Sequence, residues 1–215
     1  MTIADTAWSE YRRMVKNMSV RYVTISREFG SGGREIGKKL AERLQIPFYD
    51  KEIITKTAFK TGFAEEYVKN QGEYASARNW FEYSFTARNN FGLSPEDYLW
   101  TKQREVILEL AKEGPCVIVG RCADYILKDE TGVLNVFVHA SIPQRIERIT
   151  KIYQEAEKSE KMLRDMDKKR SFNYKYFTEQ EWGKSQNYDI TLDSGRLGID
   201  TCVEVLYSLC RPKKD

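Results

Sequence analysis

The chain has 215 residues, of which 41% are hydrophobic and 31% charged, a size and composition that suit one α/β domain with a small insert rather than two full domains. The 35 basic and 32 acidic residues leave a net charge of only +3, so bulk charge gives no indication of nucleic-acid binding. Charges throughout residues 1–20 and the lack of an apolar run of about 18 residues argue against a signal peptide and against a membrane partner. The four cysteines form no C-x-x-C pair, so we expect reduced thiols and a soluble, cytoplasmic protein.

Residues 1–20 carry apolar side chains at three- and four-residue steps, which predicts an amphipathic helix. Its apolar stripe consists of Trp8, Tyr11, Val15 and Met18. The stripe must dock on an apolar surface. That surface lies either on the domain of the same chain or on a second copy of the chain in a homodimer. The periodicity of the stripe does not distinguish these two possibilities.

A predicted strand at 22–26 is followed by a glycine cluster and then by an amphipathic helix at 34–44. Glycines let backbone N–H groups approach an anion closely, and the positive end of the helix dipole lies at the same point. The cluster therefore predicts a phosphate site, although an ordinary strand-to-helix turn uses the same residue types. The residues that would bind phosphate are Gly30, Ser31, Gly32, Gly33 and Arg34.

The cluster departs from the standard phosphate-binding loop, G-x-x-x-x-G-K-[S/T], and two registers compete. Counted from the end of the strand, Arg34 takes the place of the lysine; counted by residue identity, Lys38 does, but a full turn inside the helix. We prefer Arg34, because a cation that reaches phosphate must lie where the loop becomes a helix. The residue after the cation is Glu35 in the first register and Lys39 in the second. Neither carries the hydroxyl group that normally touches Mg²⁺, so no metal ligand is identified.

A short strand at 46–49 ends before Asp50, and a helix begins near Glu52. Residues 62–93 are rich in aromatic and amide side chains and are typical of an inserted segment that binds an acceptor, although the aromatic residues could instead pack a small core of their own. Ser94 and Pro95 begin a helix that ends at Gly114-Pro115, and Gln103 and Arg104 on it could reach the same acceptor.

The later elements are strands at 116–120, 134–139 and 188–192, with helices at 141–157 and 198–210. Strands and helices alternate, so the sheet should be mostly parallel, with helices on both faces and ligands beyond the carboxyl ends of the strands.

Three features lie near these strand ends. Arg121 directly follows a strand and either faces a ligand or forms a structural salt bridge. For His139 we favour packing or hydrogen bonding over proton transfer. The charged run 164–170 could be a solvated helix face, but its position favours a lid that brings arginines over phosphates.

Four segments in order, together with the loop sequence SREFGSGGREIG, resemble the cytidylate kinase family and particularly its divergent cytidylate-kinase-like branch. The segments are 117–126, 137–149, 164–170 and 192–199, and the similarity covers roughly residues 21–210. The resemblance implies a single P-loop kinase domain of the nucleoside monophosphate kinase type, a three-layer α/β/α fold around a parallel five-strand sheet. It also implies an acceptor-binding insert at 62–93 and a lid at 158–172.

The implied activity is transfer of the γ-phosphoryl group of ATP to CMP or dCMP with Mg²⁺. Gly30 to Gly33 would bind the ATP phosphates and Arg34 would stand in for the loop lysine. Arg121, Arg164 and Arg170 would act on the phosphates, and Asp167 on the ribose hydroxyl. The acceptor site would comprise Asp50, Lys51, Arg121 and Asp167, with Gln103 and Arg104 as candidates from the helix pattern. Lys51 stands where the classical enzymes have a serine, and Cys122 where they have an aspartate.

Two other functions remain open. One is a kinase that acts on a different small acceptor. The other is a nucleotide-binding pseudoenzyme with a sensing or scaffold role, which the altered loop cation and the missing hydroxyl suggest. In each case the expected partners are small-molecule nucleotides rather than nucleic acid.

Overall fold

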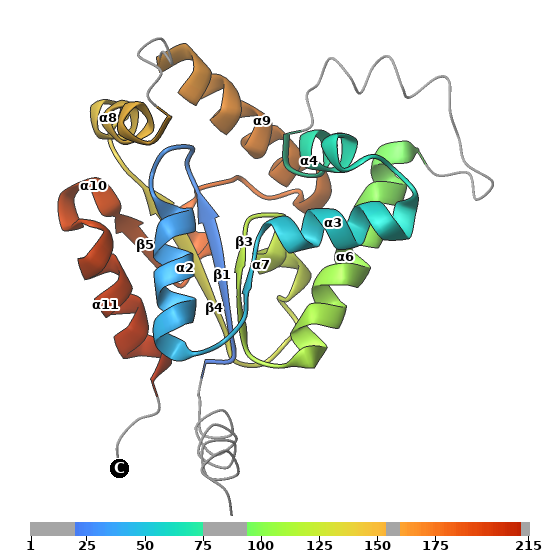
Figure 1. Cartoon of the computed structure of the whole chain (residues 1–215), viewed down its shortest axis with the longest axis horizontal. Coiled ribbons are helices and arrows are strands. Elements are labelled where there is room, and N and C mark those ends of the chain that lie inside the picture. Colours follow the sequence, from blue (N-terminus) through green and yellow to red (C-terminus); the bar gives the residue numbers. More distant parts are fainter. Residues whose placement is uncertain (1–19, 75–93, 154–159, 212–215) are drawn as a thin grey trace, which may run out of the picture.

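The computed structural model describes residues 20–74, 94–153 and 160–211 (Figure 1). The helix predicted at 1–20 and the dimer contact through it lie outside these residues, apart from Val20. Most of the predicted insert, residues 75–93, also lies outside them.

A five-stranded sheet in the order β2-β3-β1-β4-β5 forms the centre of the described residues, and all of its strands are parallel. This confirms the predicted fold class. The strands are β1 (Tyr22–Arg27), β2 (Phe48–Tyr49), β3 (Cys116–Val119), β4 (Val133–His139) and β5 (Ile190–Asp193).

Helices cover both faces of the sheet (Figure 1). Along β1, Val23 and Ile25 pack with α2 (Gly33–Leu44) and α11 (Ile199–Cys210), whereas Tyr22 points to the other face. That second face is covered by α3 (Lys51–Thr61), α6 (Pro95–Glu113) and α7 (Ala123–Ile126). Burial on both faces explains why β3 is a continuous apolar run and why every residue of β1 is buried, its polar residues included.

The remaining helices lie mainly at the carboxyl ends of the strands (Figure 1). They are α4 (Glu65–Tyr74), α8 (Ile142–Tyr153), α9 (Glu160–Thr178) and α10 (Ser194–Leu197), with a 3₁₀ turn at Ser185–Asn187. The described part of the predicted lid, residues 160–172, therefore belongs to a single 19-residue helix that continues beyond residue 172. Neither α7 nor α10 was predicted.

Two predicted strand boundaries were wrong for identifiable reasons. The second strand begins at Phe48 rather than at 46, because the Ile46 N–H donates to the Ala41 carbonyl at the end of α2. The last strand begins at Ile190 rather than at 188, because the Tyr188 N–H donates to the Ser185 carbonyl of the 3₁₀ turn.

The four cysteines, Cys116, Cys122, Cys202 and Cys210, are all buried, and none of them forms a disulfide. None of the helices in the described ranges is both long enough and apolar enough to cross a bilayer.

Two leucines on α11 test how this helix packs against the sheet. Leu206 is fully buried, whereas Leu209 is 44% exposed. We expect Leu206→Ala to lower the free energy of unfolding by about 2–5 kcal/mol and Leu209→Ala by less than about 1 kcal/mol, measured by urea unfolding. Equal losses would contradict the packing of α11 described above.

Candidate functional site

The glycine loop, residues 28–33, leaves the carboxyl end of β1 and enters α2. Gly30 and Gly32 have φ angles of 78° and 83°, in the left-handed region that glycine adopts without strain. Space is equally restrictive. A Cβ atom on Gly30 would lie 2.7 Å from Ile149 Cδ1, and one on Gly32 would lie 2.5 Å from Ile199 Cδ1. The loop is therefore glycine-rich for packing as well as for backbone conformation.

The amino end of α2 presents backbone donors at this loop. The Ile36 N–H donates to the Gly32 carbonyl as the helix begins, so the N–H groups of Gly33, Arg34 and Glu35 precede the intrahelical ladder. These groups and the helix dipole together favour an anion. The geometry agrees with the phosphate site predicted from the sequence.

A buried arginine on α8 holds the loop in place. Arg145 is 2% exposed, and its Nε donates to the Phe29 carbonyl at 2.7 Å. It also forms ion pairs with Asp167 of α9 and, at 3.2 Å, with Glu28. Asp167 in turn accepts a hydrogen bond from the Phe29 N–H at 2.7 Å. The loop, α8 and α9 thus share one ionic network.

A second set of contacts fixes the far side of the loop. Arg148 Nη1 donates to the Gly30 carbonyl at 2.9 Å. The Ser194 hydroxyl bonds to the Ser31 carbonyl and lies 3.1 Å from the His139 carbonyl. The backbone of His139 therefore helps to hold Ser194 at the loop, and packing or hydrogen bonding by its side chain stays a prediction.

Arg34, the predicted loop cation, pairs with Asp50 at 2.5 Å, and its side chain is 55% exposed. The structure thus brings two predicted site residues together, but Arg34 does not lie over the loop. Lys51 is exposed at the first position of α3. Lys38, the competing cation, is 63% exposed and lies 3.7 Å from Glu42 on the same helix.

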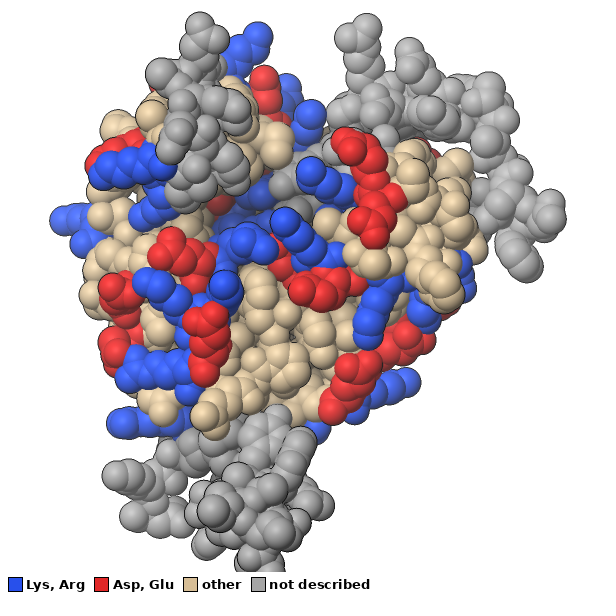
Figure 2. All heavy atoms as spheres, viewed as in Figure 1, with Lys and Arg blue, Asp and Glu red and all other residues tan. Residues whose placement is uncertain are grey.

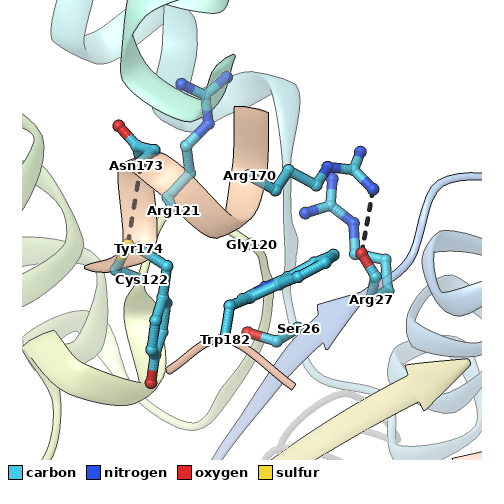
Figure 3. A pocket seen from close by; sticks show the side chains of 9 residues that line it. All are labelled: Ser26, Arg27, Gly120, Arg121, Cys122, Arg170, Asn173, Tyr174 and Trp182. Atoms are coloured by element: carbon cyan, nitrogen blue, oxygen red, sulfur yellow. Dashed lines mark hydrogen bonds between the residues drawn. The ribbon is translucent and has the colours of Figure 1, made fainter. Parts of the chain in front are cut away.

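Beside the loop, β1, β3 and α9 enclose a cavity (Figure 3). Its volume, about 20 Å³, accommodates roughly one water molecule, so an acceptor of nucleotide size requires surrounding elements to move. Figure 2 shows Lys and Arg side chains gathered around the hollow between α8 and α4. The cavity is lined by Ser26, Arg27, Gly120, Arg121, Cys122, Arg170, Asn173, Tyr174 and Trp182.

Arg121 follows β3 in an unusual backbone conformation. Gly120, Arg121 and Cys122 have successive φ angles of 73°, 59° and 52°. The buried Arg121 side chain points towards α4, and its Nη1 donates to the Val68 carbonyl and to Gln103 Oε1, each at 3.2 Å (Figure 3). Two predicted acceptor residues, Arg121 and Gln103, therefore meet.

Not every predicted site residue joins this group. Arg104, next to Gln103 on α6, is exposed, because consecutive helical residues point about 100° apart. On α9, Arg170 is 6% exposed and its Nη1 donates to the Arg27 carbonyl at 3.0 Å. Arg164 instead pairs with Glu160 one turn away and is largely exposed, as expected for a solvated helix face.

A buried pair links α7 to α9 beneath the cavity. The Tyr174 hydroxyl donates to Asp124 Oδ2 at 2.7 Å, and Asp124 is 5% exposed. Burial raises the pKa of Asp124 to about 6, and burial together with the Asp124 charge raises the pKa of Tyr174.

Several residues that the structure places at or beneath the site were not predicted from the sequence. The charged ones include Arg27, Asp124, Arg145 and Arg148. A signal existed for the two α8 residues, because arginines three positions apart on a helix that directly follows a strand share a face near the ligand edge. No comparable pattern marks Arg27 or Asp124.

The loop suits the phosphates of ATP better than it suits a bare metal ion. The described residues hold no cluster of three His, Cys, Asp or Glu side chains that could bind a metal. Glu35, in the place of the usual hydroxyl, lies 3.4 Å from Lys39. Mg²⁺ in kinase sites keeps several waters and is bound largely through substrate phosphates, so the described residues are compatible with a metal that arrives on the nucleotide.

Comparison with known proteins gives a family and a fold. Residues 22–196 match the sequence model of the cytidylate kinase-like family. An uncharacterized protein from Eubacterium ventriosum is similar in structure, with 27% identity, a TM-score of 0.64, and coverage of 87% of this chain and 96% of that one. No curated protein matches the sequence.

Two kinases of known class share the fold at lower identity. A shikimate kinase from Bacteroides thetaiotaomicron is 18% identical, with a TM-score of 0.50 over 87% of this chain and 96% of that one. A sugar kinase from Janibacter is 12% identical, with a TM-score of 0.51 over 88% and 94%.

The raised pKa of Asp124 predicts a dependence of stability on pH. A carboxyl that ionises near 6 when folded and near 3.8 when unfolded holds its proton more tightly in the native state. Its contribution to stability is greatest below about pH 4 and is lost as pH rises through about 6. Asp124→Asn should remove this loss, so the variant gains about 2–3 kcal/mol relative to wild type between pH 4 and 7.5.

Urea unfolding of both proteins across this pH range measures the difference. Asp200→Asn is the control, because Asp200 is 88% exposed. Parallel stability profiles for wild type and Asp124→Asn would show that Asp124 ionises normally.

Proposed function

We propose that this chain, which belongs to the cytidylate kinase-like family, transfers the γ-phosphoryl group of ATP to CMP or dCMP. Family and fold both support a phosphotransferase. The observation that carries the proposal is the position of the glycine loop and the amino end of α2 beside a cavity lined by three arginines. The choice of CMP or dCMP as acceptor rests on the family resemblance.

The loop binds the triphosphate of MgATP in this proposal. The N–H groups that precede the α2 ladder face the phosphate oxygens, and the α8 arginines hold the loop carbonyls in their present orientation. Arg34 leaves Asp50 to join the phosphates. The exposure of the Arg34 side chain, 55%, leaves it room for this movement.

Arg121 binds the phosphate of the acceptor. A guanidinium fork matches two phosphate oxygens at once, and the hydrogen bond to Gln103 fixes the direction of the fork. Asp50 and Lys51, at the end of the neighbouring strand β2, complete the acceptor side with Asp167 of α9.

Catalysis then depends on position and charge. Arg170, with Arg164 after movement of α9, neutralises the charge that develops on the transferring group, while closure of α9 excludes water. A general base is not required in a loose phosphoryl-transfer transition state. Arginine contacts of this kind supply rate factors of about 10³–10⁵ in related reactions.

A kinase for another small acceptor is the second candidate. Cys122 lines the cavity at a position where the resemblance leads us to expect an aspartate, and Lys51 replaces an expected serine. Both changes concern acceptor recognition. The shikimate kinase and the sugar kinase that share the fold act on acceptors other than nucleotides.

A panel of acceptors separates these functions. Purified protein with MgATP is assayed for ADP release with CMP, dCMP, UMP, AMP, shikimate and simple sugars, and ATP binding is measured by calorimetry. We expect CMP or dCMP to give the highest kcat/KM. Turnover only with shikimate or a sugar supports the second candidate, whereas ATP binding without turnover on any acceptor indicates a pseudoenzyme.

The register of the glycine loop gives a separate prediction. Arg34→Ala should lower ATP affinity or kcat by at least tenfold, because Arg34 lies at the junction of loop and helix. Lys38→Ala is the matched control, one turn further along α2 and equally exposed. Steady-state kinetics at saturating acceptor measure both, and small, equal effects would refute the preferred register.

A further inference from the structure

Arg27 is the last residue of β1 and its side chain is 8% exposed. It packs directly beneath the beginning of α2. A Cβ atom on Gly33 would lie 2.6 Å from Arg27 Cβ and 3.3 Å from Val138 Cβ. Glycine at position 33 therefore leaves the room that the Arg27 side chain occupies at the base of the glycine loop.

From this position Arg27 reaches the cavity, where it meets Arg170 (Figure 3). Arg170 Nη1 donates to the Arg27 carbonyl, and the Arg170 guanidinium lies 5.5 Å from the centre of the Phe29 ring. Arg121 lines the same cavity from the end of β3. Arg27 and Arg170 therefore bring two guanidinium groups to the cavity beside the glycine loop.

We propose that Arg27 contacts the phosphoryl group that is transferred. The proposal rests on the kinase activity proposed above. As the acceptor oxygen forms its bond to the γ-phosphorus and the bond to the ADP oxygen breaks, negative charge spreads over the equatorial phosphoryl oxygens. Arg27 donates hydrogen bonds to these oxygens and keeps its protons, because guanidinium does not ionise at neutral pH.

The surroundings of Arg27 and Arg34 explain why both cations are needed. Arg34 is half exposed and paired with Asp50, so water screens its charge. Arg27 is buried between the loop, β1 and α9, where a fixed charge acts more strongly on a developing anion. Arg27 thereby compensates for a loop that lacks the usual lysine and hydroxyl.

Binding of an inert phosphate chain tests the contact without requiring turnover. Calorimetry with inorganic tripolyphosphate compares wild type, Arg27→Ala and Arg21→Ala. Arg21 is the matched control, because it is an exposed arginine that directly precedes the opposite end of β1. We expect Arg27→Ala to raise Kd at least tenfold and Arg21→Ala to leave it within twofold. Unchanged affinity in folded Arg27→Ala overturns the proposal.

Chemical rescue separates contact from a structural role. In Arg27→Ala, kcat should fall at least 100-fold. Guanidinium chloride at tens of millimolar should raise the kcat of this variant at least tenfold. Potassium chloride at equal ionic strength should not. A loss of kcat that guanidinium does not restore, in a variant with wild-type circular dichroism and Tm, overturns the contact.

If Arg27→Ala does not fold, Arg27→Lys carries the test. It should lower kcat at least tenfold while the KM for ATP changes less than threefold, because a point charge replaces the fork. Wild-type kcat in this variant overturns the proposal.

The wild-type controls keep the two proposals distinct. If wild type releases no ADP with any acceptor while Arg27→Ala loses tripolyphosphate binding, the kinase activity is rejected and the phosphate contact of Arg27 is supported.

Discussion

The left-handed backbone of Gly30 and Gly32, beside α8 and α11, is the constraint on which the site depends. A Cβ atom on either glycine would also meet the terminal methyl group of Ile149 or Ile199, so these side chains would have to shift. That proximity allows Arg148 to reach the Gly30 carbonyl and Ser194 to reach the Ser31 carbonyl. The conformation of the loop and the packing of the two helices against it therefore depend on each other.

Charge is arranged around the loop in two different ways. Arg145 is matched by Glu28 and Asp167, and removing one member of such a buried network leaves an uncompensated charge, which is strongly destabilising. Arg27 and Arg121 instead line the cavity, and Arg121 Nη1 donates to two neutral oxygens, the Val68 carbonyl and Gln103 Oε1. The first arrangement fixes the shape of the loop, whereas the second places arginines at the cavity beside it.

Sequence patterns predicted the features that depend on local residue order. The alternation of strands and helices indicated the parallel sheet, and the Ser94 cap is present as expected, with its hydroxyl accepting from the Asp97 N–H. The glycine cluster and Arg121 were identified because each directly follows a strand. The pairing of Arg121 with Gln103 was not predictable, because it depends on how α6 packs against the sheet.

Other features depend on contacts between distant segments, for which no periodic pattern of residues provides a signal. The Asp124–Tyr174 bond joins residues 50 positions apart, and Asp124 looks like an ordinary helix-start acid. Arg34 was expected over the loop, but in this structure Asp50 at the end of β2 holds it. The length of α9 was underestimated, because charged residues mark only its first half.

The continuity of α9 has a consequence for how the glycine loop and the cavity can move. A helix of 19 residues is a rod about 28 Å long. Its middle contacts the glycine loop through Asp167 and the end of β1 through Arg170, and the next turn supplies Asn173 and Tyr174 to the cavity wall. A tilt of this helix therefore displaces a support of the loop and a wall of the cavity together.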